Sequence, residues 1–549
     1  MLDTFISRIG NSIRTGWDRP ALKDFRKDGL TYGQFASELL RLQLLWENAG
    51  LQKGDKIAIC ARSCSNWLKV FHAGVTGGYV SVQLFNGFTP SDVMGLVNHS
   101  DSRILYTEKA IFDKMDFSLM PQVIGVVDTL TMELLASREG FEKVYGSLDE
   151  AFAKEYPHGV SPEDVNLTDR DMDDVCAIMY TSGSTGSPKG VMLTVRNFST
   201  NVDSVIDLVP FRRGTPYVSL LPFAHIFGLT CDGIIPFTMG MSVTVLVIPP
   251  IPSNVKDIMM EVRPNIFFAV PLILSKFVDY AVGDLISCDA GKKRLADYQN
   301  NPEYCRMLHD IIFRYLGGNI EVFLTGGAAI PSELESLLAF KIGLPFATGY
   351  GMTETAPVLS VGQLGAYKPK SCGLLNEKYM EYRIDSPDPE HIAGELQCRG
   401  GEVFAGYYKN PEATSRTFTE DGWFRTGDLG TIDADRNLFL VGRCKSMILS
   451  TNGQNIFPEE IEVILNELPY VAESVVVARG QRLVAIIVPD ADAAAHSDID
   501  ADSLYELMKQ NVAVLNSRIP QYSQVAEFEL RYEPFAKTPK GSIKRFMYC

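Results

Sequence analysis

Short apolar runs alternate with amphipathic stretches along most of the chain. Thr31–Gln34 reads as a capping box that opens a leucine-rich helix ending near Gly50. This alternation predicts an α/β fold of layered, mostly parallel sheets. The runs predicted as buried strands are 56–60, 104–107, 123–127, 176–180, 266–270 and 322–327.

The pattern changes after Gly394. The stretch "GELQCRGGEVFAGYY" predicts a small twisted β subdomain of antiparallel strands with glycine bends. A helix is predicted over 456–468, followed by a hairpin around Gly480. The last hundred or so residues, a typical small-domain size, therefore predict a separate mobile α+β domain. We place the boundary between a large N-terminal domain, 1–443, and a C-terminal domain, 444–549.

Charge and composition narrow the function classes. The 549 residues carry 51 basic and 67 acidic side chains, a net charge of −16, which disfavours a duplex nucleic-acid binder. The chain opens without a secretory signal pattern. The most apolar later stretch, 233–250, is interrupted by Pro236 and Gly240, so we expect a buried strand instead of a membrane span. Ten singly placed cysteines favour reduced thiols in the cytoplasm over a disulfide frame or zinc site.

One loop has the composition of a ligand-binding site. "YTSGSTGSPKGVML" (180–193) crowds glycines and hydroxyl side chains around Lys189, between two apolar runs. Glycines let the backbone approach a ligand, and hydroxyls and a lysine add donors and charge, which is typical of phosphate binding. It is not a Walker A loop, because Pro188 and Gly190 flank the lysine. A flexible linker is the alternative, and the strand-like flanks argue against it.

Several further motifs follow in a fixed order, and together with this loop they resemble the adenylate-forming (AMP-binding) enzymes. The resemblance runs from about residue 28 to the C-terminus and is closest to long-chain fatty acyl-CoA synthetases. Each motif is weak alone, whereas the ordered set is specific. The motifs are "LPFAHIFGL" (221–229), "TGGAAI" (325–330), "TGYGMTETAP" (348–357), "GYYKNPEAT" (406–414), "DGWFRTGDLG" (421–430), "GRCKSM" (442–447) and "NGQNIFPEEIE" (452–462).

The resemblance implies a phosphate and metal site. Glu354 would be the Mg²⁺ ligand, with the hydroxyl of Thr181 as a second contact, and Thr353 would touch the α-phosphate. Taken alone, Thr353 and Glu354 read equally well as an ordinary helix cap. The residues implied to hold the β- and γ-phosphates of ATP are Thr181, Ser182, Gly183, Ser184, Thr185, Gly186 and Lys189.

The resemblance also implies the rest of the nucleotide site. Tyr350, beside Gly351, would stack on adenine, and the backbone of Gly327 and Ala328 would line its edge. Asp428 would accept both ribose hydroxyls, since one carboxylate offers two acceptor oxygens. A Gly-Asp turn is the rival interpretation. Arg443 would add a donor to the same ribose.

Two other positions have implied roles and plain alternatives. His225 would lie near the reacting carboxylate, although a lone histidine in an apolar run is often a core residue. Lys445 stands where the family has its hinge, and the alternative is a solvated charge. Both assignments rest on the resemblance.

The chain departs from the family near its end. The family reads Pro-Lys-Thr-x-x-Gly-Lys-x-x-Arg, whereas this chain reads "AKTPKGSIKRF" (536–546), with Ser542 at the catalytic lysine position. Lys540, rather than Lys544, is our candidate substitute. The alternatives are slow adenylation with an intact thioester step, a binding-only relative, or lysines that form a solvated basic tail.

Together these features predict an AMP-forming acid–thiol ligase. It would use ATP, Mg²⁺ and coenzyme A to activate a medium- or long-chain fatty acid, a choice favoured by segments 272–316 and 317–338. The alternatives are a ligase that loads an acyl carrier protein and a binding-only relative without turnover. Peripheral membrane contact is compatible with a fatty substrate.

Overall fold

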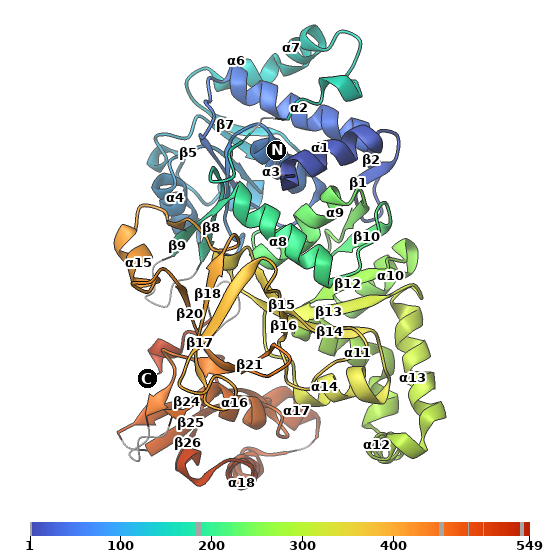
Figure 1. Ribbon diagram of the computed structural model, residues 1–549, viewed down its shortest axis with the longest axis vertical. Coiled ribbons are helices and arrows are strands. Elements are labelled where there is room, and N and C mark those ends of the chain that lie inside the picture. The colour runs from blue at the N-terminus through green and yellow to red at the C-terminus, as the bar shows by residue number, and fades with distance from the viewer. Residues whose placement is uncertain are drawn as a thin grey trace. The chain divides into compact units, whose positions relative to one another are not determined.

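The computed structural model describes residues 3–167, 170–181, 188–449, 455–480, 482–497, 499–537 and 543–548. The chain forms two compact units, which are described separately below (Figure 1). The first unit comprises Met1–Glu381 and Arg399–Phe418, and the second comprises Tyr382–Cys398 and Thr419–Cys549. The boundary at 443/444 drawn from the sequence stays a prediction.

An eight-stranded sheet forms the first layer of the first unit. Its central strands β8, β4, β3, β5 and β6 are parallel, as the alternating pattern predicts, and antiparallel strands close both edges. In spatial order the strands are β19 (Gly406–Tyr407), β9 (Lys189–Thr194), β8 (Val175–Thr181), β4 (Val80–Gln83), β3 (Lys56–Cys60), β5 (Ser102–Thr107), β6 (Gly125–Asp128) and β7 (Leu134–Ser137).

Two further strand groups complete the first unit. In one, β12, β13 and β14 are parallel and β15 and β16 are antiparallel; they are β12 (Ile266–Ala269), β13 (Val322–Gly326), β14 (Phe346–Gly351), β15 (Val358–Val361) and β16 (Gly373–Leu375). The other is a four-stranded sheet in the order β10 (Pro216–Ser219), β11 (Ser242–Val245), β1 (Pro20–Asp24) and β2 (Gly29–Thr31). The strands predicted over 56–60, 104–107, 123–127, 176–180, 266–270 and 322–327 are all present, so the predicted α/β fold is confirmed.

Helices cover these sheets. α2 begins at the predicted capping box, in which Thr31 and Gln34 bond each other's backbone N–H. The helices of this unit are α1 (Phe5–Thr15), α2 (Tyr32–Asn48), α3 (Ser65–Thr76), α4 (Pro90–His99), α5 (Lys109–Phe112), α6 (Phe141–Gly146), α7 (Leu148–Glu155), α8 (Val195–Leu208), α9 (Ile235–Thr238), α10 (Pro252–Val262), α11 (Pro271–Ser287), α12 (Asp289–Ala296), α13 (Pro302–Tyr315), α14 (Ser332–Ser336) and α15 (Pro411–Arg416).

The prediction of a buried strand over the apolar stretch 233–250 is wrong for its first part. That part continues a π-helical turn, Gly228–Ile234, into α9, and only β11 is extended. Most of the residues are buried, and the stretch becomes exposed at Pro249 and Pro250. A short run of apolar residues indicates that the segment is buried, but it has no alternation of apolar and polar positions. The sequence therefore cannot distinguish a helix from a strand there. No helix among the described residues is long and apolar enough to cross a membrane.

The second unit combines a β subdomain and an α+β block. Its strands run in the order β21 (Asn437–Arg443), β20 (Phe424–Ile432), β18 (Gly394–Gly400) and β17 (Met380–Asp385), followed by a two-stranded pair, β22 (Ile448–Leu449) and β23 (Asn455–Ile456). The predicted hairpin around Gly480 is β24 (Val471–Arg479) with β25 (Arg482–Pro489), and β26 (Glu527–Leu530) pairs with β25. The helices are α16 (Pro458–Asn466), α17 (Ala491–His496) and α18 (Ala501–Arg518).

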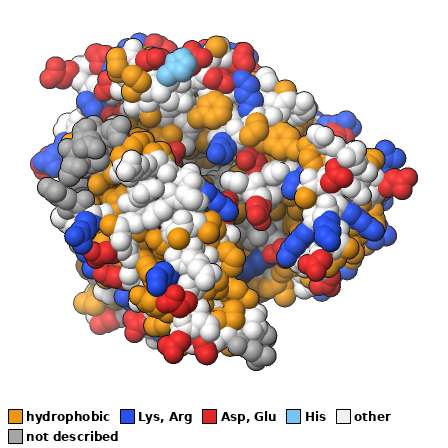
Figure 2. Space-filling model, turned by 90° about the horizontal axis from the view of Figure 1, so that it is seen from below, with side chains coloured by type: hydrophobic (Ala, Val, Ile, Leu, Met, Phe, Trp, Pro, Cys, Tyr) orange, Lys and Arg blue, Asp and Glu red, His pale blue; other side chains and the backbone are white. Residues whose placement is uncertain are grey.

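The charges on the surface are mixed. On the face drawn in Figure 2, basic and acidic side chains are interspersed and do not gather by sign. This agrees with the net charge of −16, which offers no broad positive field to a polyanion. An anionic ligand must therefore be held by groups at a local site.

Candidate functional site

The ends of two paired strands frame the phosphate loop. Thr181 is the last residue of β8, and it pairs with Lys189, the first residue of β9. Ser182, Gly183, Ser184, Thr185 and Gly186 lie between them, outside the described residues. The pairing brings one hydroxyl and one ammonium group to the same end of the hairpin.

The structure brings Glu354 to this same region through Tyr407. β19 pairs with β9, which sets Tyr407 beside Val191 and places the Lys189 Nζ atom 4.9 Å from the centre of the Tyr407 ring. The Tyr407 hydroxyl donates a hydrogen bond to Glu354 Oε1 at 2.9 Å. Burial raises the pKa of Tyr407, and the neighbouring Glu354 carboxylate raises it further, so the phenol stays protonated and donates.

Helix α8 holds the two segments that carry these side chains. Asn197 Nδ2 donates to the carbonyl oxygens of Gly401 and Val403, at 2.9 and 2.8 Å, one turn before Asn201 donates to Thr355 and Val358. The two segments are also joined directly, because the Phe404 N–H donates to the Glu354 carbonyl at 2.9 Å. The backbone around Glu354 is therefore held by α8 and by Phe404, and its side chain is held by Tyr407. Thr353, the predicted α-phosphate contact, is buried in the adjoining turn.

The other predicted nucleotide contacts follow two parallel strands. Gly327 and Ala328 are exposed directly after β13, and Tyr350 and Gly351 end β14. Because Gly326 is in register with Gly349, these groups meet at the carboxyl edge of the strands, where α/β sheets bind ligands. A side chain at Gly351 would meet the Pro357 carbonyl oxygen at 2.0 Å, so only glycine fits there.

His225 lies in a loop that a buried carboxylate shapes. Its Nδ1 accepts the Phe227 N–H at 3.2 Å, so the proton of the neutral ring lies on Nε2. Asp232, in the π-helical turn, accepts the N–H groups of Leu220 and Leu221, both at 2.9 Å, and burial raises its pKa to about 7. The half-buried His225 is therefore part of an ordered loop.

The second unit holds the predicted ribose pair and hinge. Asp428 on β20 is in register with Arg443 on β21, and their side chains form an ion pair with Arg443 Nε 2.9 Å from Asp428 Oδ1. The Asp428 side chain is 7% exposed and that of Arg443 is 65% exposed, so the carboxylate is fixed by a partner that still faces solvent. Lys445, two residues on, is exposed.

The remaining predicted residues lie outside the part of the chain that the structure describes. Lys540 and Ser542 lie there, as do the loop residues named above. Tyr407 is the functional candidate that residue-by-residue reasoning missed, although it stands in the motif "GYYKNPEAT". Asn197 and Asn201 carried no signal, because their contacts are to backbone far away in the chain.

The donor set suits a magnesium ion bound with a polyphosphate. Among the described residues there is no cluster of three or more His, Cys, Asp or Glu side chains able to hold a metal by themselves. Mg²⁺ commonly takes one or two protein oxygen ligands and completes its shell with phosphate oxygens and water. Glu354, with Thr181 near the same loop, fits that requirement.

This layered α/β fold with a hydroxyl, a lysine and a lone glutamate around a glycine-rich loop defines an enzyme that binds a nucleoside polyphosphate. The comparison with protein families identifies it further. Residues 11–408 match the AMP-binding enzyme family, and residues 445–548 match the AMP-binding enzyme C-terminal domain. The chain belongs to the AMP-binding enzyme family, which confirms the predicted class, an AMP-forming acid–thiol ligase.

Individual relatives are distant. The chain is 28% identical to the peroxisomal long chain acyl-CoA synthetase 6 of Arabidopsis thaliana, over 94% of this chain and 79% of that protein. It is 26% identical to the chloroplastic long-chain-fatty-acid–[acyl-carrier-protein] ligase AEE15 of the same plant, over 96% and 83%. The crystal structure of ATP-bound MatB from Rhodopseudomonas palustris has a similar fold, with a TM-score of 0.77 at 21% identity over 100% and 98% of the two chains.

Proposed function

We propose that this enzyme is an ATP-dependent acyl-CoA synthetase acting on a medium- or long-chain fatty acid. In the first half-reaction a carboxylate oxygen attacks the α-phosphorus of ATP and pyrophosphate leaves. In the second, a thiol attacks the acyl carbon and AMP leaves. The observation that carries the proposal is the meeting of Thr181, Lys189, Tyr407 and Glu354 at one strand end, since such chemistry needs placed charges instead of a nucleophilic triad.

The proposed roles of the chain's residues combine the family resemblance with the contacts described above. Lys189 and the loop beside it would hold the β- and γ-phosphates, while Tyr407 orients the Glu354 carboxylate by donating to one of its oxygens. The other proposed roles are α-phosphate contact by Thr353, adenine contact by Tyr350, Gly351, Gly327 and Ala328, ribose contact by Asp428 and Arg443, approach of the acid near His225, charge stabilisation by Lys540, and a hinge at Lys445.

Glu354 and Thr181 are the proposed holders of Mg²⁺. When bound there, the ion would neutralise phosphate charge. Because the Tyr407 hydroxyl bonds Oε1, the second carboxylate oxygen of Glu354, Oε2, is the proposed ligand atom. Glu354 in turn lies on a backbone turn that α8 fixes, so the carboxylate is placed before the nucleotide arrives.

The acid and the acceptor are proposed from the relatives. The relatives named above include one protein called a long chain acyl-CoA synthetase and one called an acyl-carrier-protein ligase. We therefore favour coenzyme A and a fatty acid, with a carrier protein as the second candidate. A cytoplasmic location, with peripheral membrane contact, is proposed from composition, and the nine described cysteines are free thiols.

Pyrophosphate release with a panel of acids tests the proposal. We expect release with ATP, Mg²⁺ and fatty acids of medium or long chain, and thioester formation only after coenzyme A is added. Thioester on a carrier protein and none on coenzyme A would favour the second candidate. Absence of pyrophosphate release with every acid would leave nucleotide binding without turnover and would overturn the enzyme proposal.

A further inference from the structure

A hollow opens on the first unit, at the amino ends of strands of the eight-stranded sheet, whereas Thr181 lies at the carboxyl end of β8. Its volume is about 420 Å³, within the usual range for small-molecule sites. Lys56, Val80 and Val175 line it, and they are the first residues of β3, β4 and β8. Thr181 lies six residues along β8 from Val175 and three from Ile178, distances of about 20 and 10 Å in a strand. None of the residues that line the hollow is one of the predicted nucleotide contacts.

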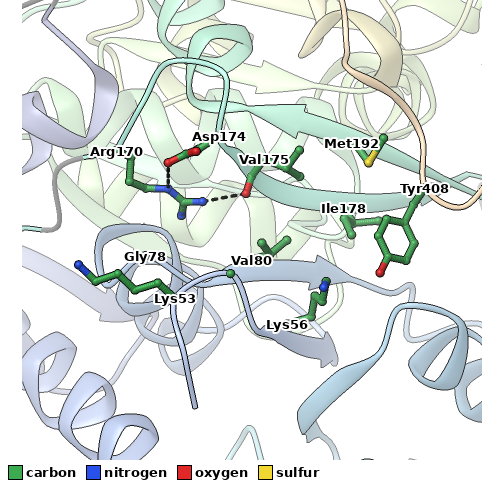
Figure 3. A pocket seen from close by; sticks show the side chains of 11 residues that line it. Lys53, Lys56, Gly78, Val80, Arg170, Asp174, Val175, Ile178, Met192 and Tyr408 are labelled. Atoms are coloured by element: carbon green, nitrogen blue, oxygen red, sulfur yellow. Dashed lines mark hydrogen bonds and ion pairs between the residues drawn. The ribbon is translucent and has the colours of Figure 1, made fainter.

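One wall of the hollow is apolar. Val80, Val175, Ile178 and Met192 lie on adjacent strands β4, β8 and β9, and all four line the hollow. The ring of Tyr408 closes the wall at one end, as Figure 3 shows. A ligand that fills this hollow must bring an apolar or aromatic body, because polar groups against this wall would lose hydrogen bonds to water.

The rim of the hollow is basic. In Figure 3, Lys53 and Lys56 lie on the same side of the hollow as Val80, across from Val175, Ile178 and Met192. Among the described residues neither lysine forms an ion pair within 4.0 Å. The Lys56 Nζ atom lies 5.7 Å from the centre of the Tyr408 ring. The nearby Asp101 carboxylate is already bonded by Tyr408 and by Lys409, both at 2.7 Å.

The single acid of the lining is also compensated. Figure 3 shows the Arg170 guanidinium beside Asp174, at 3.8 Å, and donating to the Val175 carbonyl oxygen at 2.7 Å. Arg170 also donates to the Tyr79 carbonyl oxygen at 2.8 Å. Arg170 is thereby fixed as part of the wall, and its charge offsets that of Asp174. Two lysine charges remain over one hollow in a chain of net charge −16.

We propose that this hollow is a second small-molecule site, for an amphipathic organic anion such as a phosphate monoester with a small aromatic or alkyl body. The apolar body rests on the wall formed by Val80, Val175, Ile178 and Met192. The anionic group accepts charge-assisted hydrogen bonds from Lys53 and Lys56. An inorganic anion would leave the wall in water, and an uncharged ligand would leave the lysines without a partner, so neither matches both sides of the hollow.

A ligand in this hollow could affect the proposed reaction centre, because the two regions share strands β8 and β9. Ile178 is three residues from Thr181 on β8, Met192 is three residues from Lys189 on β9, and Tyr408 follows Tyr407. Each therefore shares a backbone segment with a group of the phosphate region. The binding claim itself does not rest on the proposed function.

Titration calorimetry of the full-length protein with 1-naphthyl phosphate, in saturating AMP, tests the site. We expect binding of one molecule that AMP does not displace, with weaker binding of 1-naphthol and of inorganic phosphate. Lys53→Ala and Lys56→Ala should each weaken binding about tenfold, as expected for the loss of one hydrogen bond to a charged group. Both side chains reach solvent, so these variants are expected to fold, and their melting temperatures check this.

Lys293→Ala is the matched control, because Lys293 is exposed on α12 and does not line the hollow. It should bind like the parent protein. Displacement by AMP, equal binding by the parent and both lysine variants, or absence of binding at millimolar probe would each overturn the proposal.

Discussion

Glu354 and Glu402 lie on two joined segments of the first unit, yet they are in opposite environments. The Glu354 carboxylate is half-buried and accepts the Tyr407 hydroxyl at 2.9 Å. Glu402 is fully buried, and neither of its oxygens forms a well-oriented hydrogen bond with a described residue. Burial raises the pKa of Glu402 to about 8, and the nearby Ser204 and Asn201 side chains offset only part of that effect.

The difference teaches that residue type does not assign function here. A carboxylate that meets a donor and solvent can bind a cation, whereas a desolvated carboxyl without a partner takes up a proton instead. Glu354 is therefore expected to act in the reaction, and Glu402 is expected to act only on stability. Reaction rate and the pH dependence of stability are the two measurements that separate these residues.

The largest effect is expected for Glu354→Gln. This change keeps the shape and removes the charge, so pyrophosphate release should fall by about 10²–10³, the usual loss for one preorganised charge-stabilising group. AMP binding, measured by calorimetry, should be retained. Glu402→Gln is the matched control, and it should keep the rate within about twofold because the native carboxyl is already protonated near neutral pH.

Equal rates for the parent enzyme and Glu354→Gln at saturating Mg²⁺ would remove Glu354 from the metal site. A large loss in Glu402→Gln alone would reverse the comparison.

A smaller effect is expected for Tyr407→Phe. Loss of the hydroxyl frees the Glu354 carboxylate from its orienting donor, which should raise the Mg²⁺ concentration needed for half-maximal rate about tenfold. Tyr408→Phe is the matched control, since its hydroxyl donates to Asp101 instead. If both variants show the same Mg²⁺ dependence as the parent, Tyr407 has only a packing role.

The third prediction concerns stability instead of rate, and it follows from the pH dependence of folding. Between about pH 4.5 and pH 8 folded Glu402 holds a proton that the unfolded chain has released, so its contribution to stability falls as pH rises through this window. The slope is at most about 1.4 kcal/mol per pH unit. The side chain at position 402 in the Glu402→Gln variant cannot ionise. The melting temperature of this variant should therefore exceed that of the parent protein by an amount that grows from pH 5 to pH 8.

Thermal melts of both proteins across that range measure the gap. A gap that stays constant with pH would show that Glu402 is already ionised in the folded protein. Glu354→Gln, measured in parallel, controls for loss of a carboxyl on the neighbouring segment.

The sequence by itself determined the layered α/β fold and the family. Period-two and period-3.6 patterns are local, so strands such as β3 and the capping box at Thr31 were readable. The ordered motifs named Glu354, Lys189 and Asp428 as candidates because each lies in a short, specific stretch. They could not show the π-helical turn at Gly228–Ile234, since a short apolar run has burial without a clear period.

Only the tertiary structure decided how the candidates meet. Tyr407 is 53 residues from Glu354, and their hydrogen bond exists because β19 pairs with β9 and α8 bonds both segments. The lysines at the amino ends of the strands became a candidate site in the same way, since parallel pairing places Lys56, Val80 and Val175 side by side. Local sequence patterns specify individual helices and strands. Contacts between distant segments depend instead on which strands pair and which side chains are buried from solvent, and both are properties of the whole fold.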